Sequence, residues 1–152
     1  MFRGTAIALA ALALVSCGPK VAPLEGTWAW FDPAACEGNR DTIEFAGQDF
    51  FHRRMGDVFV ESHDVAYRVT GDEGTEWITA TYGVQSVESG ATRSVALTFE
   101  PQGDNTLIFR GSVVDGAAPA NAGNVIGRLL YRCVDGAAVL DDANGDGLLD
   151  AD

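Results

Sequence analysis

The segment LEGTWAW at residues 24–30 sets the pattern that the rest of the chain repeats. Leu24, Trp28 and Trp30 fall on one side of the segment when residues alternate with a period of two, which is typical of a β-strand with one buried face. Asp, Pro, Gly and Asn residues follow at 32–39 and are typical of a loop. The sequence therefore predicts a first strand at 24–30 and a loop after it.

The same theme, a short alternating run closed by turn residues, recurs along the chain. The runs are rich in β-branched and aromatic residues, which favour strands. No later stretch keeps a helical period over three turns. The expected strands are carried by Ile43 and Phe45, Phe51, Val58 and Val60, residues 65–69, 77–82 and 95–99, Leu107 and Phe109, and residues 125–133.

Eight or nine short antiparallel strands at this spacing predict an all-β fold, a barrel or a sandwich. Consecutive hairpins favour a single antiparallel up-and-down β-barrel of about eight strands, because consecutive strands usually pair. A closed sheet also has no exposed edge that could template aggregation. We place this barrel at residues 24–133.

The triplet Gly26-Thr27-Trp28 on the first strand resembles the GxW motif of lipocalins. The resemblance implies a lipocalin-like barrel in which an arginine of the last strand packs on the tryptophan, and Arg128 or Arg132 could supply it. A guanidinium stacked on an indole contributes about 0.5 to 2 kcal/mol and would join the first strand to the last. The chain departs from the family in having no TDY-like motif late in the sequence.

Residues 1–16 have the layout of a secretory signal peptide, with Arg3 before an apolar run at 6–15. This run is too short for a bilayer, which needs about 20 apolar residues. LVSC at residues 14–17 resembles the lipobox of bacterial lipoproteins, and the resemblance implies that Cys17 becomes the lipidated first residue. The alternative is an ordinary signal peptide followed by a disulfide-bonded cysteine. Gly18, where the resemblance would place an inner-membrane retention Asp, favours the outer membrane.

The net charge of the mature chain limits the kinds of molecule that it can bind. Removing residues 1–16 takes away one of ten basic residues and none of 22 acidic ones, so 9 minus 22 leaves a net charge of −13. Nucleic acid and anionic lipid headgroups are poor partners for such a surface. We therefore expect residues 17–23 to be a lipidated tether, followed by one domain and an acidic tail at 134–152.

Three cysteines in an exported protein leave one odd thiol. If Cys17 carries lipid, Cys36 and Cys133 remain as a pair in an oxidising compartment, and we expect a disulfide between them. Closing a loop of nearly a hundred residues contributes about 4 kcal/mol on the chain-entropy model. The alternative is two separate buried thiols.

A barrel of eight strands is either filled by its side chains or holds one small ligand. Bulky inward residues favour a filled core, whereas a small apolar ligand would need space between them. The residues expected to point inward include Trp28, Trp30, Phe45, Phe51, Tyr67, Phe99, Phe109 and Tyr131.

The sequence offers no catalytic residues. His52 and His63 have no nucleophile or ligand cluster nearby, and we expect both to be solvated, with His52 opposite Phe59. Glycine-rich nucleotide motifs are also absent from the sequence. We therefore do not expect an enzyme.

The acidic tail resembles an EF-hand calcium loop, and also a thrombospondin type 3 or dockerin repeat. Crowded carboxylate and carbonyl oxygens suit Ca²⁺, with an expected Kd near about 10⁻⁴ to 10⁻³ M. The alternative is an acidic disordered terminus. The calcium ligands would be Asp142, Asn144, Asp146, Leu148 through its carbonyl, and Asp150, with Gly147 at the sharp turn.

Together these features predict a lipoprotein attached to the outer membrane, on its periplasmic face or at the cell surface. Its expected function is non-enzymatic binding of a small apolar ligand or an envelope component, with no required cofactor except a possible Ca²⁺. The alternative is a structural or protein-interaction module of the envelope with a filled barrel and a calcium-binding tail. A packed interior with an exposed apolar patch would favour the second function.

Overall fold

The computed structural model describes residues 23–71 and 75–140, and it is all-β in these ranges. Two short 3₁₀ helices interrupt the strands, and no helix among the described residues has the length and apolar character to cross a membrane. The elements are β1 Gly26–Ala29, η1 Pro33–Asn39, β2 Asp41–Ala46, β3 Asp49–Arg54, β4 Asp57–Ser62, β5 Ala66–Thr70, β6 Trp77–Gln85, β7 Thr92–Gln102, β8 Thr106–Val114, η2 Ala122–Asn124, β9 Leu129–Val134 and β10 Ala137–Ala138.

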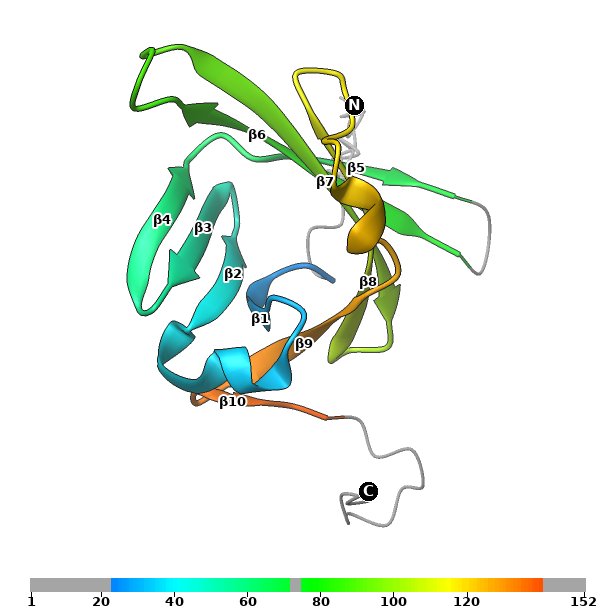
Figure 1. Cartoon of the computed structure of the whole chain (residues 1–152). Helices are drawn as coiled ribbons and strands as arrows, with labels where there is room; N and C mark the ends of the chain where they lie inside the picture. Colours follow the sequence, from blue (N-terminus) through cyan, green and yellow to red (C-terminus); the bar gives the residue numbers. More distant parts are fainter. Residues whose placement is uncertain (1–22, 72–74, 141–152) are drawn as a thin grey trace, which may run out of the picture.

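The strands form one curled antiparallel sheet in the order β4-β3-β2-β1-β9-β8-β7-β6-β5, with β10 paired to β9 (Figure 1). β1 joins the first strands to the last, because it pairs with β2 on one side and with β9 on the other. Trp28 lies opposite Arg132 in the second of these ladders. The fold is thus the expected all-β, barrel-like meander, with the first and last long strands side by side.

The expected closure fails at one place, between β4 and β5. Every other consecutive pair of the strands β1–β9 forms a ladder, whereas β4 and β5 are the two ends of the sheet. The chain between them crosses the β2–β3 turn instead. There the N–H of Val65 donates to the carbonyl of Gln48 (3.0 Å), and the Tyr67 hydroxyl donates to the carbonyl of Gly47 (2.7 Å). These bonds direct β5 towards β6 and leave the outer edge of β4 without a ladder.

Aromatic side chains fill the interior of the sheet. Phe99 is fully buried and lies between Phe109 and Phe45, at 5.8 Å from each ring centroid. Phe45 then packs on Phe50 (5.2 Å), and Phe50 stacks on Tyr82 (4.2 Å). Burial raises the pKa of the Tyr82 hydroxyl, as expected for a phenol inside an apolar core. One continuous series of aromatic contacts therefore crosses the core from β8 to β6.

Two of the expected inward residues point elsewhere. Phe50, not Phe51, faces the core, because Phe50 lies opposite Phe45 in the β2–β3 ladder and alternation turns Phe51 outward. Tyr131 packs on the opposite face of the sheet from its buried neighbour Leu130. Because Phe50 and Phe51 are both aromatic, the sequence does not show which of them faces the core, and the pairing with β2 decides it.

The disulfide between Cys36 and Cys133 is present and forms the centre of a second, smaller cluster. Its Cα atoms are 5.5 Å apart, and it joins η1 to β9. Ala138 of β10 packs against this cluster. β10 follows a turn at Asp135 and Gly136, which both have positive φ, so the Asp-Gly pair makes a tight hairpin inside the expected tail.

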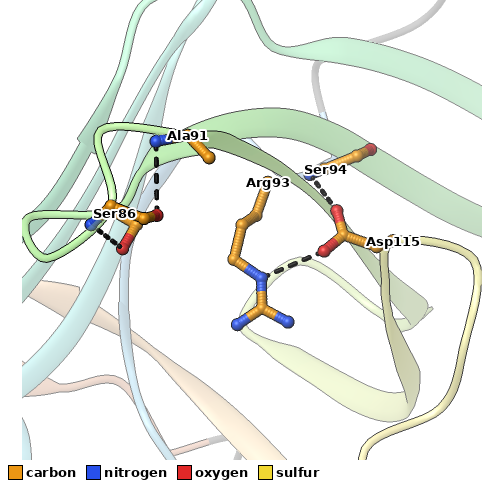
Figure 2. A network of polar contacts seen from close by, with 6 residues as sticks. Ser86, Ala91, Arg93, Ser94 and Asp115 are labelled. Atoms are coloured by element: carbon orange, nitrogen blue, oxygen red, sulfur yellow. Dashed lines mark hydrogen bonds and ion pairs between the residues drawn. The ribbon is translucent and has the colours of Figure 1, made fainter.

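A polar network connects the long loop after β8 to β7 (Figure 2). The carboxylate of Asp115 accepts from Nε of Arg93 (3.0 Å) and from the N–H of Ser94 (2.8 Å). These two bonds lower the pKa of Asp115, the one from Arg93 most strongly. The network ties the loop to the β7 end of the long β6–β7 hairpin.

Candidate functional site

Two hollows among the described residues lie away from the main core. One hollow of about 350 Å³ is lined by Pro23, Pro101, Gly103, Asp104 and Arg132. A second, of about 330 Å³, lies at the β5–β6 hairpin beside Trp77. Neither includes a residue of the main core cluster. These two hollows therefore do not reach the filled interior.

Arg132, and not Arg128, packs on Trp28. Its guanidinium carbon lies 4.3 Å from the centroid of the Trp28 ring. Two hydrogen bonds fix the guanidinium, from Nη1 to the carbonyl of Glu25 (2.8 Å) and from Nε to the carbonyl of Asp104 (2.7 Å). Arg128 lies over Phe31 instead, at 4.8 Å. The Trp28–Arg132 pair therefore holds β1 to β9 and is structural.

Gly26 makes room for this pair. Its φ is +121°, a conformation that side chains rarely adopt. A Cβ atom at this position would lie 2.6 Å from Nη1 of Arg132. The glycine, the tryptophan and the arginine therefore form one local unit at the start of β1.

The β3–β4 hairpin carries three large, exposed apolar side chains. Met55, Val58 and Phe59 expose 79%, 49% and 61% of their surface, and we call these three residues the hairpin surface. Met55 and Gly56 both have positive φ and make a two-residue turn between Arg54 and Asp57. A bulge in β4 follows, where Val58 and Val60 pair with Arg53 and His52 and leave Phe59 as the extra residue.

His52 packs beneath Phe59 of the hairpin surface. It was expected to be solvated, but it is largely buried. Its side chain is 13% exposed, and Nε2 lies 2.7 Å from Oδ1 of Asp41. The imidazole packs between the rings of Trp30 (5.7 Å) and Phe59 (5.8 Å). It lies opposite Val60 rather than Phe59, because the bulge shifts the register. The arrangement orients His52 and fixes Phe59 at the surface.

Arg54 also contacts the ring of Phe59. Its guanidinium carbon lies 4.5 Å from the Phe59 ring centroid, and its Nε lies 3.9 Å from Oδ1 of Asp41. Phe59 is therefore held by contacts with both a cation and an imidazole. A half-exposed ring held in this way can contact a partner with little loss of side-chain entropy.

His63 lies beyond β4 and is exposed, as expected. Its Nδ1 lies 2.8 Å from Asp49 and its Nε2 lies 3.0 Å from Glu61. The hydrogen bond to Asp49 is the largest cause of a raised pKa at His63, and Glu61 adds to it. The carboxylates of Asp49 and Glu61 thus both contact the imidazole of His63, just after the C-terminal end of β4.

Several predicted site residues lie outside the described residues. These are Cys17 and the calcium ligands Asp142, Asn144, Asp146, Leu148 and Asp150. Among the residues that the structure describes, no group of three or more His, Cys, Asp or Glu side chains is placed to hold a metal ion.

The sequence did not single out the hairpin surface as a site. The sequence predicts a strand at Val58 and Val60, but the exposure of this strand depends on β4 being an end of the sheet. Comparison of the chain with protein-family models, with curated proteins and with solved structures finds no match.

Proposed function

We propose that this protein is a lipid-anchored, non-enzymatic interaction module of the bacterial cell envelope, and that it binds another protein through the hairpin surface. One observation carries the proposal: the interior is filled by its own aromatic side chains, while three large apolar side chains of the β3–β4 hairpin are exposed. Clustered exposed apolar side chains are typical of protein interaction sites.

Binding of a small apolar ligand inside the sheet is less well supported. The rings of Phe45, Phe50, Phe99 and Phe109 are buried and in contact with one another. A ligand there would have to displace these contacts. Cavities for small ligands are usually largely formed before the ligand enters.

The location in the envelope rests on the sequence. The proposed lipid on Cys17 would tether the domain through residues 17–23, close to the membrane surface. The Cys36–Cys133 disulfide supports an oxidising compartment, because disulfides are rare in reducing ones. A lipocalin-like relationship is part of the same proposal, and it is supported by the packing of Arg132 on Trp28 of the Gly26-Thr27-Trp28 motif.

The interaction is tested by placing a photo-reactive phenylalanine analogue at Phe59 in cells that produce the full chain. The matched control carries the analogue at Val87, a fully exposed apolar residue of the β6–β7 turn. We expect a discrete cross-linked protein species from position 59 and none from position 87. The absence of a species from position 59, or equal yields from both positions, would contradict the proposal.

The anchor is tested separately with Cys17→Ala. We expect the parent to partition with membranes and the variant, if still exported, to be released into the soluble fraction. Equal membrane partitioning of both proteins would show that Cys17 is not the anchor.

A further inference from the structure

The outer edge of strand β4 forms no ladder within residues 23–71 and 75–140, although β4 also approaches β6. The inner edge of β4 pairs with β3 over Asp57–Ser62, and β4 is the last strand of the sheet on that side. Backbone groups of an edge strand that point away from its neighbour are unpaired and can accept another strand. Closed barrels have no such edge strand. Here β5 does not pair with β4 but pairs with β6.

The two faces of β4 differ in chemistry. On the core side, Val60 packs against the main core and Phe59 contacts His52, whereas Val58 lies opposite Arg53 and so shares the outer face with Glu61. On the other side, Glu61 points to His63, which lies against the outward-facing Phe51. Side chains of an added strand alternate between the same two faces. Such a strand would meet apolar neighbours on one face and a carboxylate on the other.

Carboxylates outnumber basic side chains around this edge, where Arg53 and Arg54 of β3 are paired with Glu44 and Asp41. Asp49 and Glu61 share the imidazole of His63, and both are about half exposed. Asp57 and Asp64 at the two ends of β4 are also exposed. The mature chain has a net charge of −13 if residues 1–16 are removed, with 9 basic and 22 acidic residues. A second copy of this chain is therefore disfavoured as the occupant, and a basic segment is favoured.

We propose that the free edge of β4 receives an extended segment of a partner protein in which basic and apolar residues alternate. The segment adds to the sheet by main-chain hydrogen bonds to β4, as in other cases of β-strand addition. Its apolar side chains lie beside Phe59 and Val60 on one face, and its basic side chains lie beside Glu61 on the other. This inference rests on the proposed function and names the kind of partner that the hairpin surface binds.

The opposite end of the sheet provides an internal control. β5 is also an edge strand, but it carries the basic residue Arg68 at its centre, and its Tyr67 is engaged with Gly47. Val69 on β5 is 40% exposed, close to the 49% of Val58 on β4. Replacing either valine by lysine introduces the same charge on an exposed edge strand, and edge lysines prevent strand addition.

The probe is a synthetic peptide of alternating lysine and valine, as long as β4, mixed with the purified full chain. Backbone amide hydrogen exchange is measured residue by residue with and without the peptide. We expect about tenfold slower exchange at β4 amides and no change at β5. A peptide of alternating glutamate and valine should give no protection. The lysine–valine peptide should also give no protection when its amides along one edge are N-methylated.

The variants locate the binding. Val58→Lys should abolish the protection, Val69→Lys should leave it intact, and Glu61→Gln should weaken peptide binding by about two- to fivefold. Thermal unfolding of each variant shows whether it is folded, and if Val58→Lys does not fold, the N-methylated peptide still decides the question. No protection at β4, protection at β5, or equal binding of the acidic peptide would overturn the inference. A cross-link from Phe59 in cells together with such a failure would leave the proposed function standing and remove only strand addition.

Discussion

The guanidinium of Arg132 on β9 stacks on the indole of Trp28 on β1, 4.3 Å from its centroid, and the two residues lie directly opposite each other in the ladder between these strands. This contact joins β1, the first strand along the chain, to β9 near the end of the chain. Trp28 is fully buried and its Nε1 donates to the carbonyl of Leu24 (2.8 Å), so the ring is fixed from both sides.

Gly26→Ala should destabilise the fold by about 1 to 3 kcal/mol, because it forces an alanine into a strained φ and its Cβ into Nη1 of Arg132. The measurement is urea unfolding of both proteins. Gly123→Ala is the matched control, because nothing lies within 4 Å of a Cβ there and its φ is not positive. Equal losses for the two variants would show that Gly26 has no special role.

Arg132→Lys should cost about 1 to 2 kcal/mol, since lysine cannot both stack on Trp28 and donate to two carbonyl groups at once. Arg128→Lys is the control, because Arg128 lies over Phe31 and its one hydrogen bond to a backbone carbonyl is long, at 3.5 Å. Denaturant unfolding with tryptophan fluorescence measures both. If the Arg128 variant loses as much stability as the Arg132 variant, the assignment is wrong.

Removal of the disulfide with Cys36→Ala and Cys133→Ala together should lower the free energy of unfolding by about 4 kcal/mol, because the bond closes a long loop in the unfolded chain. The two cysteines are 97 residues apart in sequence. Equilibrium unfolding with and without a reductant measures the same quantity in the parent. A loss below about 1 kcal/mol would mean that native-state strain cancels the gain in chain entropy.

The stability contributed by His63 should fall as the pH rises. Asp49 and Glu61 raise the pKa of His63 above its ordinary value of 6.5 in the folded state, so the protonated form binds them and stabilises the fold. This contribution is fully present below pH 6.5 and is lost as the pH rises through the raised pKa. Thermal unfolding of the parent and of His63→Asn should therefore differ most at acidic pH and converge at alkaline pH. A constant difference across this range would contradict the assignment.

Asp115 should act in the opposite direction. The bonds from Arg93 and Ser94 lower its pKa below the ordinary value of 3.8, so the charged form stabilises the fold. This contribution is present above pH 3.8 and is lost as the pH falls through the lowered pKa. Asp115→Asn keeps the tolerance for the positive φ of this residue and should flatten the acid limb of the stability curve. Parallel curves for parent and variant would contradict this.

Much of the fold was predictable because alternation is a local signal. The strand runs follow from spacing and composition, and the Cys36–Cys133 pair follows once the lipobox resemblance assigns Cys17 to lipid. The structure confirms the all-β fold and the disulfide. Asp135-Gly136 carried an equally local hairpin signal, but the run after it is too short to be recognised as a strand.

The rest depends on which strand lies beside which. The neighbours Phe50 and Phe51 are equally apolar, and only the pairing of Phe50 with Phe45 decides that Phe50 is the core residue. The free edge of β4 depends on the route of the chain across Gln48, which no local pattern predicts. The candidate site was missed for the same reason, because exposure of Phe59 is a property of the whole sheet.

The most direct test of the proposed function is native mass spectrometry of the protein released gently from membranes. We expect the mass of a chain that begins at an acylated Cys17 and contains the Cys36–Cys133 disulfide, with no retained small molecule and an organic extract free of apolar ligand. A stoichiometric apolar molecule that is lost on extraction would contradict a filled interior, and with it the proposal that this protein works through its outer surface.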